Sequence, residues 1–336
     1  MPTLLGIGFC LWRQLRLVRI RLTPLKRSEA STATRAGILL ARMARDNRVD
    51  CYYAGARRVA EPVLARANVG LTMDQPILIE ERDGTVARLT LNRPGARNSL
   101  SLDLLERMHS AVAELGAADD VHVIVIAAAG PGFCAGHDLK ELTAARAAPD
   151  NGRAFFEDTM DKCAGLMMAI VRCPKPVIAE VHGVATAAGC QLVASCDLAV
   201  ASDVAQFATP GVNIGLFCST PMVALSRNVG RKTAMKMLLT GDLISADDAA
   251  RIGLVNDVVA AADVRSATYD LARKIASKAP ATLRIGKEAF YRQVEMPLPD
   301  AYRYAAEVMV LNMLEPDAKE GISAFIGKRN PVWNPL

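Results

Sequence analysis

The chain has 336 residues, of which 51% are hydrophobic and 22% are charged, and its formal net charge is +5. This length can bury a large core in one large domain or two, and the composition is ordinary for a soluble globular protein. The net positive charge comes from residues 1–72, which contain 13 Lys and Arg and 4 Asp and Glu (net +9). The rest of the chain contains 27 Lys and Arg and 31 Asp and Glu (net −4). The overall charge therefore does not support nucleic-acid binding.

The basic N-terminal segment, residues 1–73, is expected to be a poorly ordered extension. Its first apolar stretch is too short to span a bilayer. The amphipathic run RQLRLVRIRLTPLKR follows, and no acidic residue occurs before Glu29, which is typical of a mitochondrial presequence. A translation start at Met73 or Met43 would account for the segment equally well. The predicted location is the mitochondrial matrix if the presequence is genuine, and the cytoplasm otherwise.

From residue 74 to about residue 260 the sequence alternates strands with helices. Two apolar runs on either side of Asp83-Gly84 predict a β-hairpin. Residues 129–133 are expected to be a loop, and Asp138 is a candidate helix N-cap, like Ser101 and Ser245. The expected strands are 77–81, 86–91, 121–127, 177–181, 198–201 and 254–259, and the expected helices are 101–116, 138–145, 155–172, 220–229, 232–240 and 246–252.

After residue 260 the pattern is helical throughout. Helices are expected at 262–278, 281–292, 299–312 and 317–327. This order predicts an α/β protein with a core of stacked ββα units over residues 74–260 and a helical C-terminal region over residues 261–336.

The stretch from Pro176 to Asp203 predicts a strand, a tight turn, a helix start and a second strand. The small residues of Ala185–Gly189 leave little side chain in front of the backbone N–H groups at the helix start. Such groups can bind an oxygen that carries negative charge. A tightly packed βαβ crossover gives the same pattern, so this stretch alone does not assign a function.

Four stretches in one order resemble the enoyl-CoA hydratase/isomerase family, which has the crotonase (ClpP-like) fold. They are Ala96–Leu100, Phe133–Glu141, Pro176–Asp203 and the segment from Leu239 to Val255. The resemblance covers roughly residues 76–330 and implies a spiral core of ββα units. It also implies acyl-CoA as substrate or ligand in fatty acid metabolism, no bound cofactor, and a homotrimer or homohexamer assembled through the C-terminal helices.

The resemblance implies an oxyanion hole in which the backbone N–H groups of His137 and Ala188 polarise the thioester carbonyl. Two fixed donors in a dry site are what a developing oxyanion requires. Lys140 could contact CoA phosphates or be a solvated helix residue. The positions implied to contact substrate are Ala96, Asn98, Ala135, Gly136, Lys140, Gly211, Ser219, Phe325 and Lys328.

The family's acid positions carry no carboxylate in this chain. The two hydratase glutamates match Gln191 and Gly211, and a third acid position, used by some isomerases and dehalogenases, matches Ser219. An amide can orient a water molecule but cannot exchange a proton near neutral pH. General acid–base catalysis is worth about 10²–10⁴ per group, so the sequence argues against ordinary hydration.

Other side chains offer little replacement for the missing acids. The imidazole of His137 could titrate near neutral pH, although the interpretation we favour is a loop residue whose backbone alone matters. Ser219 and its neighbour Cys218 would need a nearby base to act as nucleophiles, and none is evident. No Cys pair has CxxC spacing and the histidines show no metal spacing, so no metal is expected, and the eight cysteines are interpreted as buried free thiols.

Two functions remain open at this point. The chain is either an acyl-CoA enzyme of altered chemistry or a non-catalytic acyl-CoA-binding or regulatory subunit. The sequence does not decide whether it is an enzyme.

Overall fold

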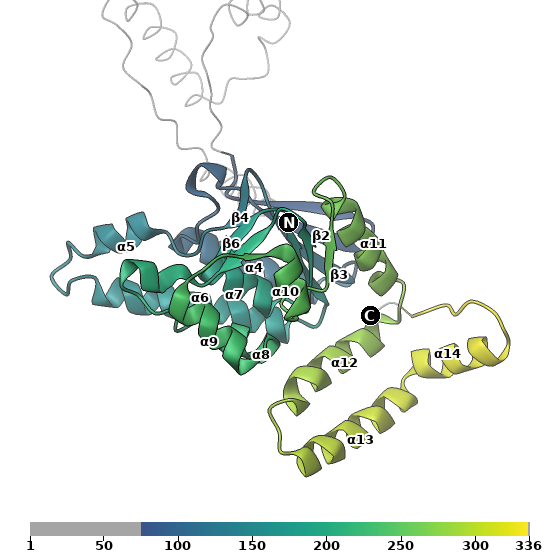
Figure 1. Cartoon of the computed structure of the whole chain (residues 1–336). Helices are drawn as coiled ribbons and strands as arrows, with labels where there is room; N and C mark the ends of the chain where they lie inside the picture. Colours follow the sequence, from purple (N-terminus) through teal and green to yellow (C-terminus); the bar gives the residue numbers. More distant parts are fainter. Residues whose placement is uncertain (1–74, 335–336) are drawn as a thin grey trace, which may run out of the picture. The chain divides into compact units, whose positions relative to one another are not determined.

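The computed structural model describes residues 75–334, so the predicted N-terminal extension lies outside the described residues (Figure 1). It has a six-stranded sheet in the order β1-β2-β3-β5-β7-β10 and a four-stranded sheet in the order β4-β6-β8-β9. The strands are β1 Leu78–Asp83, β2 Val86–Leu91, β3 Val123–Ala128, β4 Gly132–Cys134, β5 Val177–Val181, β6 Val184–Thr186, β7 Leu198–Ser202, β8 Gln206–Ala208, β9 Ile244–Ser245 and β10 Asp257–Val259.

The helices follow the predicted order, and the α/β class with an all-helical C-terminal region is confirmed. The three predicted N-caps, Ser101, Asp138 and Ser245, each accept a hydrogen bond from a backbone N–H in the first turn of the helix. No helix within residues 75–334 is long and apolar enough to cross a bilayer. The helices are α4 Leu102–Ala117, α5 Leu139–Ala145, α6 Arg153–Arg172, α7 Ala188–Ser195, α8 Pro221–Asn228, α9 Arg231–Thr240, α10 Ala246–Arg251, α11 Val264–Ala276, α12 Pro280–Gln293, α13 Leu298–Leu314 and α14 Pro316–Ile326, with 3₁₀ turns η2 Pro94–Ala96 and η3 Pro210–Ile214.

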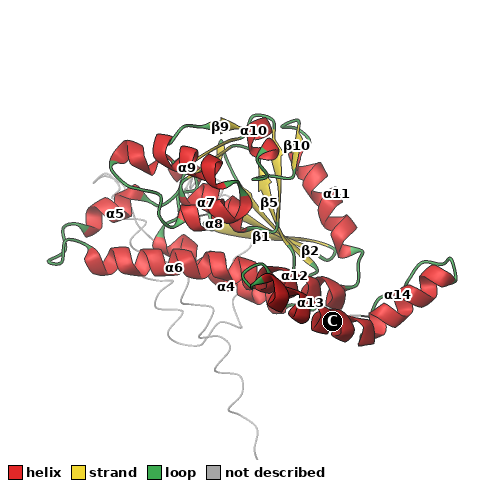
Figure 2. Cartoon of the chain, turned by 60° about the horizontal axis from the view of Figure 1, so that its bottom comes forward, coloured by secondary structure: helices red, strands yellow, loops and turns green. Residues whose placement is uncertain are grey.

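The six-stranded sheet is covered by helices on both faces, with α11 on one and α4 on the other (Figure 2). Strand β3 is buried along its whole length because it lies inside the sheet between two parallel neighbours. Its residues Val123 and Val125 pack with Tyr269 of α11, whereas Ile124 and Ile126 join the main core. This burial on both faces explains the continuous apolar run in its sequence.

The second sheet differs from the prediction. The segment 129–133 was expected to be a loop and 185–189 a turn, but β4 and β6 occupy parts of them and pair in parallel with each other. Strand β6 also pairs in parallel with β8, with Thr186 opposite Ala208. These strands have three residues each, which is too short for an alternating pattern to appear in the sequence.

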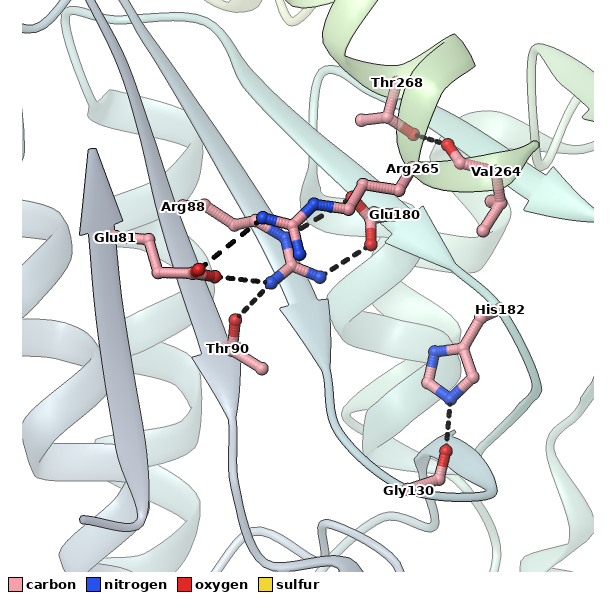
Figure 3. A network of polar contacts seen from close by, with 9 residues as sticks. All are labelled: Glu81, Arg88, Thr90, Gly130, Glu180, His182, Val264, Arg265 and Thr268. Atoms are coloured by element: carbon pink, nitrogen blue, oxygen red, sulfur yellow. Dashed lines mark hydrogen bonds and ion pairs between the residues drawn. The ribbon is translucent and has the colours of Figure 1, made fainter. Parts of the chain in front are cut away.

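A charged cluster lies on the α11 face of the six-stranded sheet, with Arg88 and Glu180 buried and Glu81 exposed (Figure 3). Arg88 of β2 donates to Glu180 of β5 at 2.7 Å and to Glu81 of β1 at 2.8 Å. It also donates to the hydroxyl of Thr90 at 2.8 Å. The hydrogen bond from Arg88 lowers the pKa of Glu81. Because β3 lies between β2 and β5, this cluster spans four neighbouring strands, β1, β2, β3 and β5.

A second buried ion pair attaches the C-terminal helices to the core. Lys287 of α12 donates from Nζ to Asp197 Oδ2 at 2.7 Å and to two backbone carbonyl oxygens near the end of α6. Asp197 also accepts from Tyr291 at 2.9 Å and from the backbone N–H of Val177 at 2.6 Å. Burial raises the pKa of Asp197 even though Lys287 acts in the opposite direction. Asp197 therefore supports both the strand β5 and the position of α12.

We predict that Lys287→Met lowers the free energy of unfolding by about 3–5 kcal/mol, because it leaves the buried carboxylate of Asp197 without its cation. The measurement is urea unfolding at neutral pH. Arg227→Ala is the matched control, since its pair with Glu295 is more than half exposed and such pairs contribute about 1 kcal/mol or less. Equal losses for the two variants would contradict the assignment.

Candidate functional site

Three parallel strands of the second sheet, β4, β6 and β8, end at the same edge. The turns that follow them are Ala135–Asp138, Ala187–Ala188 and Thr209–Gly211. The carboxyl ends of parallel strands are the usual place for a ligand in α/β proteins. A cavity of about 470 Å³, a size suited to a small molecule, runs along these strands and reaches this edge at Ala135, Ala208 and Pro210. It is lined by Arg97, Pro131, Gly132, Ala135, Val184, Thr186, Ala208, Pro210, Asn213, Gly241 and Leu243.

The first turn presents the backbone N–H of His137. Leu100 donates to the carbonyl oxygen of Gly136 at 2.7 Å, and Asp138 donates back to the carbonyl oxygen of Leu100 at 3.1 Å. In a parallel bridge these two bonds flank His137, so its own N–H faces away from Leu100. Within residues 75–334 this N–H has no acceptor. The predicted first donor is therefore available to a ligand.

The second turn presents the backbone N–H of Ala188, the first residue of α7. The helix bonds begin with Gln191 donating to Ala187, so the N–H of Ala188 has no acceptor in the helix. Ala187 has φ 51° and ψ −118°, a conformation that normally requires glycine. This strained geometry sets the plane of the peptide that carries the Ala188 N–H. Backbone strain of this kind is concentrated at functional sites.

Gly136 allows the two turns to touch. A Cβ at this position would lie 2.9 Å from the Cβ of Ala187 and 3.4 Å from the backbone nitrogen of Ala188, and its φ is 95°. Any side chain here would separate the turns. The structure thus brings the two predicted donors, His137 and Ala188, to adjoining turns.

Gln191 lies in the first turn of α7 and is only 5% exposed. The thiol of Cys163 lies 3.9 Å from its Oε1, a weak contact. Among the described residues no carboxylate is hydrogen-bonded to this side chain. The amide can therefore orient a ligand or a water molecule, but the position holds no acid.

Gly211, at the second glutamate position, has no acidic side chain, and the neighbouring backbone leaves no space for one. A Cβ at Gly211 would lie 2.6 Å from the carbonyl oxygen of Leu216 and 2.9 Å from the sulfur of Cys218. A side chain at 211 thus requires the segment after η3 to move. Ser219 is exposed, and burial raises the pKa of the Cys218 thiol, which keeps it protonated.

The side chains of His137 and Thr209 are unusual at this edge. Burial lowers the pKa of His137, so the imidazole is neutral near neutral pH. Both of its ring nitrogens and the hydroxyl of the fully buried Thr209 lack a hydrogen-bond partner within residues 75–334. The sequence pattern did not single out Thr209, because a threonine before proline carries no signal of its own.

The predicted CoA loop is held by Asn98. Its Oδ1 accepts from the N–H of Arg93 at 2.8 Å, and its Nδ2 donates to the carbonyl oxygens of Ala129 and Gly132 at 2.8 and 2.9 Å. The side chain is fully buried and holds the loop, so Asn98 can offer a ligand only its backbone. Arg97, which the sequence analysis did not select, follows Ala96 and lines the cavity.

Arg93 and Asp138 link this loop to the turn that carries His137. Arg93 donates to Asp138 Oδ2 at 2.8 Å. Burial alone would raise the pKa of Asp138, but the hydrogen bonds from Arg93 and the N–H of Lys140 lower it overall. The pair therefore fixes the turn, which agrees with the capping role expected for Asp138.

The remaining predicted contacts are more distant. Lys140 is exposed on the first turn of α5. Phe325 and Lys328 lie at the end of α14, which packs on α12 and α13, and both views place it far from α5. Phe325 is 85% exposed. A single chain does not bring these two residues to the edge where His137 and Ala188 meet.

Comparisons with known proteins agree with the fold and with the order of the motifs. A family model described as enoyl-CoA hydratase/isomerase matches residues 81–335. The chain is 48% identical over 260 residues to enoyl-CoA hydratase domain-containing protein 3, mitochondrial, of Xenopus laevis, covering 77% of this chain and 86% of that protein. The human protein of the same name is 47% identical over 260 residues, with coverages of 77% and 84%.

Two solved structures support the same assignment. A Mycobacterium smegmatis enoyl-CoA hydratase is 51% identical with a TM-score of 0.74, covering 77% of this chain and 99% of that one. Human enoyl-CoA hydratase domain-containing protein 3 is 45% identical with a TM-score of 0.73, covering 77% and 100%. The predicted crotonase fold is confirmed by these matches. The chain belongs to the enoyl-CoA hydratase/isomerase family.

Proposed function

We propose that the chain binds the thioester carbonyl of an acyl-CoA through the backbone N–H groups of His137 and Ala188. The observation that carries this proposal is the contact between two turns that each hold an N–H without an acceptor among residues 75–334. A thioester oxygen that accepts both hydrogen bonds gains negative charge, and the buried edge strengthens the attraction. The 470 Å³ cavity beside the two turns suits the pantetheine arm.

The chemistry that follows binding requires no paired glutamates. Gln191 can hold a polar group in place but cannot take its proton, and the contacts of Gly211 leave no room for a second acid. We therefore favour an acyl-CoA enzyme whose reaction uses the oxyanion site alone. The closure at Gly211 equally favours the second candidate, a non-catalytic acyl-CoA-binding or regulatory subunit.

The CoA phosphates need positive charge near the cavity mouth. Arg97 lines the cavity and Lys140 is exposed on α5. Phe325 and Lys328 are proposed to reach the ligand from an adjoining subunit, because their own chain keeps them away. Guanidinium and ammonium groups form strong charge-assisted hydrogen bonds with phosphate.

A homotrimer or homohexamer is proposed from the exposed apolar surface of the C-terminal helices. Large hydrophobic side chains are more than half exposed on α12, α13 and α14 and at the C-cap of α12. Apolar area on this scale normally marks an interface. The residues are Phe290, Val294, Leu298, Tyr302, Met309, Val310, Leu311, Met313, Leu314, Ile322, Phe325 and Ile326.

A mitochondrial location is proposed for the protein. The named relatives from Xenopus laevis and human are mitochondrial proteins. The basic, acid-poor start of this chain agrees with a presequence. Import and cleavage of the tagged full chain by isolated mitochondria would test it.

We predict that the full chain binds butyryl-CoA more tightly than free CoA, because free CoA lacks the thioester carbonyl oxygen that the two N–H groups are proposed to bind. Ala188→Pro removes one N–H at the first position of α7, where proline breaks no helix hydrogen bond, and the conformation of Ala187 makes a folding control necessary. Loss of such a donor costs about 10²–10³ in rate for an enzyme, and a binding subunit should lose affinity for butyryl-CoA. Titration calorimetry measures the affinities, with circular dichroism as the folding control. The proposal fails if no acyl-CoA binds to the wild type.

We predict that crotonyl-CoA hydration by the wild type is at least about 10²-fold slower than in relatives with both acids. Gln191→Glu should raise the rate, whereas Gln191→Met should not. Gly211→Glu should not increase the rate further, because its Cβ meets Leu216 and Cys218, and it should lower the melting temperature. Ultraviolet absorbance of the enoyl thioester follows the reaction. A wild-type rate equal to that of acid-bearing hydratases would refute the argument.

A further inference from the structure

Ala187 has a backbone conformation that its own methyl group opposes. Its φ of 51° and ψ of −118° are close to those of the first central residue of a type II′ turn, where glycine is usual. Arg97 also has a positive φ, but its ψ of 37° lies in the left-handed helical region, which residues with a side chain can enter. Ala187 lies outside that region. Its conformation therefore lowers the stability of the fold.

Three neighbouring segments hold Ala187 in this conformation. Its N–H donates to the carbonyl oxygen of Ala208, at the end of β8, at 2.9 Å. Its carbonyl oxygen accepts from the N–H of Gln191, in α7, at 3.0 Å. Its methyl group faces Gly136 in the turn after β4, because a Cβ at Gly136 would lie 2.9 Å from the methyl carbon. A strained residue persists where the surrounding structure fixes it in this way.

The conformation of Ala187 decides where the N–H of Ala188 points. The peptide between the two residues is planar, so its N–H turns with the ψ angle of Ala187. A glycine at 187 would reach the same angles without strain, but it would also reach many others. The methyl group facing Gly136 restricts this rotation. The N–H of Ala188 is thus directed before a ligand arrives, and a donor fixed in advance needs no reorganisation when charge develops on the ligand.

We propose that Ala187 is a positioning residue, whose methyl group fixes the direction of the Ala188 N–H and in doing so lowers the stability of the fold. The inference rests on the proposed thioester site. It predicts that removal of the methyl group changes stability and thioester binding in opposite directions. A residue that only supports the fold would not weaken binding when its replacement makes the protein more stable.

The test is Ala187→Gly in the full-length protein. The melting temperature should rise by about 2–4 °C, because relief of the strain outweighs the added freedom of the unfolded chain. In titration calorimetry, the ratio of the affinities for butyryl-CoA and free CoA should fall at least about threefold. Infrared spectra of butyryl-CoA labelled with ¹³C at the thioester carbonyl report the hydrogen bonds directly, since such bonds lower the stretching frequency. This lowering should be smaller in the variant.

Ala194→Gly is the matched control. It also removes the methyl group of a buried alanine, but near the far end of α7 and at an ordinary helical position. Its melting temperature should fall, because glycine weakens a helix interior and leaves a small cavity. The affinity ratio and the carbonyl frequency should equal those of the wild type.

Two results would overturn the inference. In one, Ala187→Gly has an affinity ratio and a carbonyl frequency shift at least as large as those of the wild type, so the methyl group does not direct the N–H. In the other, its melting temperature does not rise, so the alanine is not strained. Both leave the proposed thioester site intact, because the wild type still prefers butyryl-CoA to free CoA. If the wild type does not bind butyryl-CoA, the proposed function itself fails.

Discussion

The backbone's need for hydrogen-bond partners governs this structure, and the edge of the second sheet is where that need is left unmet. The N–H groups of His137 and Ala188 have no acceptor in the described residues, while the backbone around them is paired. In the bridge to Leu100, the carbonyl of Gly136 and the N–H of Asp138 form the hydrogen bonds on either side of His137. At the start of α7, the N–H of Ala188 has no acceptor within the helix. Gly136 then allows both turns to approach one another. The two N–H groups proposed to polarise a thioester therefore belong to the main chain alone, whatever side chains occupy the acid positions.

The surroundings of this edge are held by polar side chains that are hydrogen-bonded within the protein. The side chain of Asn98 bonds to the backbone of its own loop and the neighbouring one, and the ion pair of Arg93 with Asp138 holds the turn of His137. Further away, Arg88 with Glu180 locks the main sheet, and Lys287 with Asp197 attaches α12. These pairs differ from the candidate donors, because among the described residues their side chains have no buried polar atom without a hydrogen-bond partner. The residues that hold the site in place are thus different from those whose N–H groups remain available to a ligand.

The longer helices and strands could be predicted because their buried positions recur at a regular spacing that the sequence shows as apolar residues. The hairpin, β3 and the amphipathic helices each show the period of their secondary structure, and Ser101, Asp138 and Ser245 mark helix starts chemically. The small sheet was not predictable, since three residues show no period and its strands are selected by backbone pairing across long sequence separations. The motifs located His137, Ala188 and Gln191. The role of Arg97 and the isolation of Thr209 depend on distances that no local pattern encodes.

The contact between Gly211 and the segment that follows it also has a consequence for redesign of the site. A glutamate at 211 requires Leu216 and Cys218 to move, and Cys218 is buried in the present loop. The residue at 211 and the backbone path of residues 216–218 are therefore coupled. Grafting a second acid onto this chain calls for exchange of the whole loop and not of one residue.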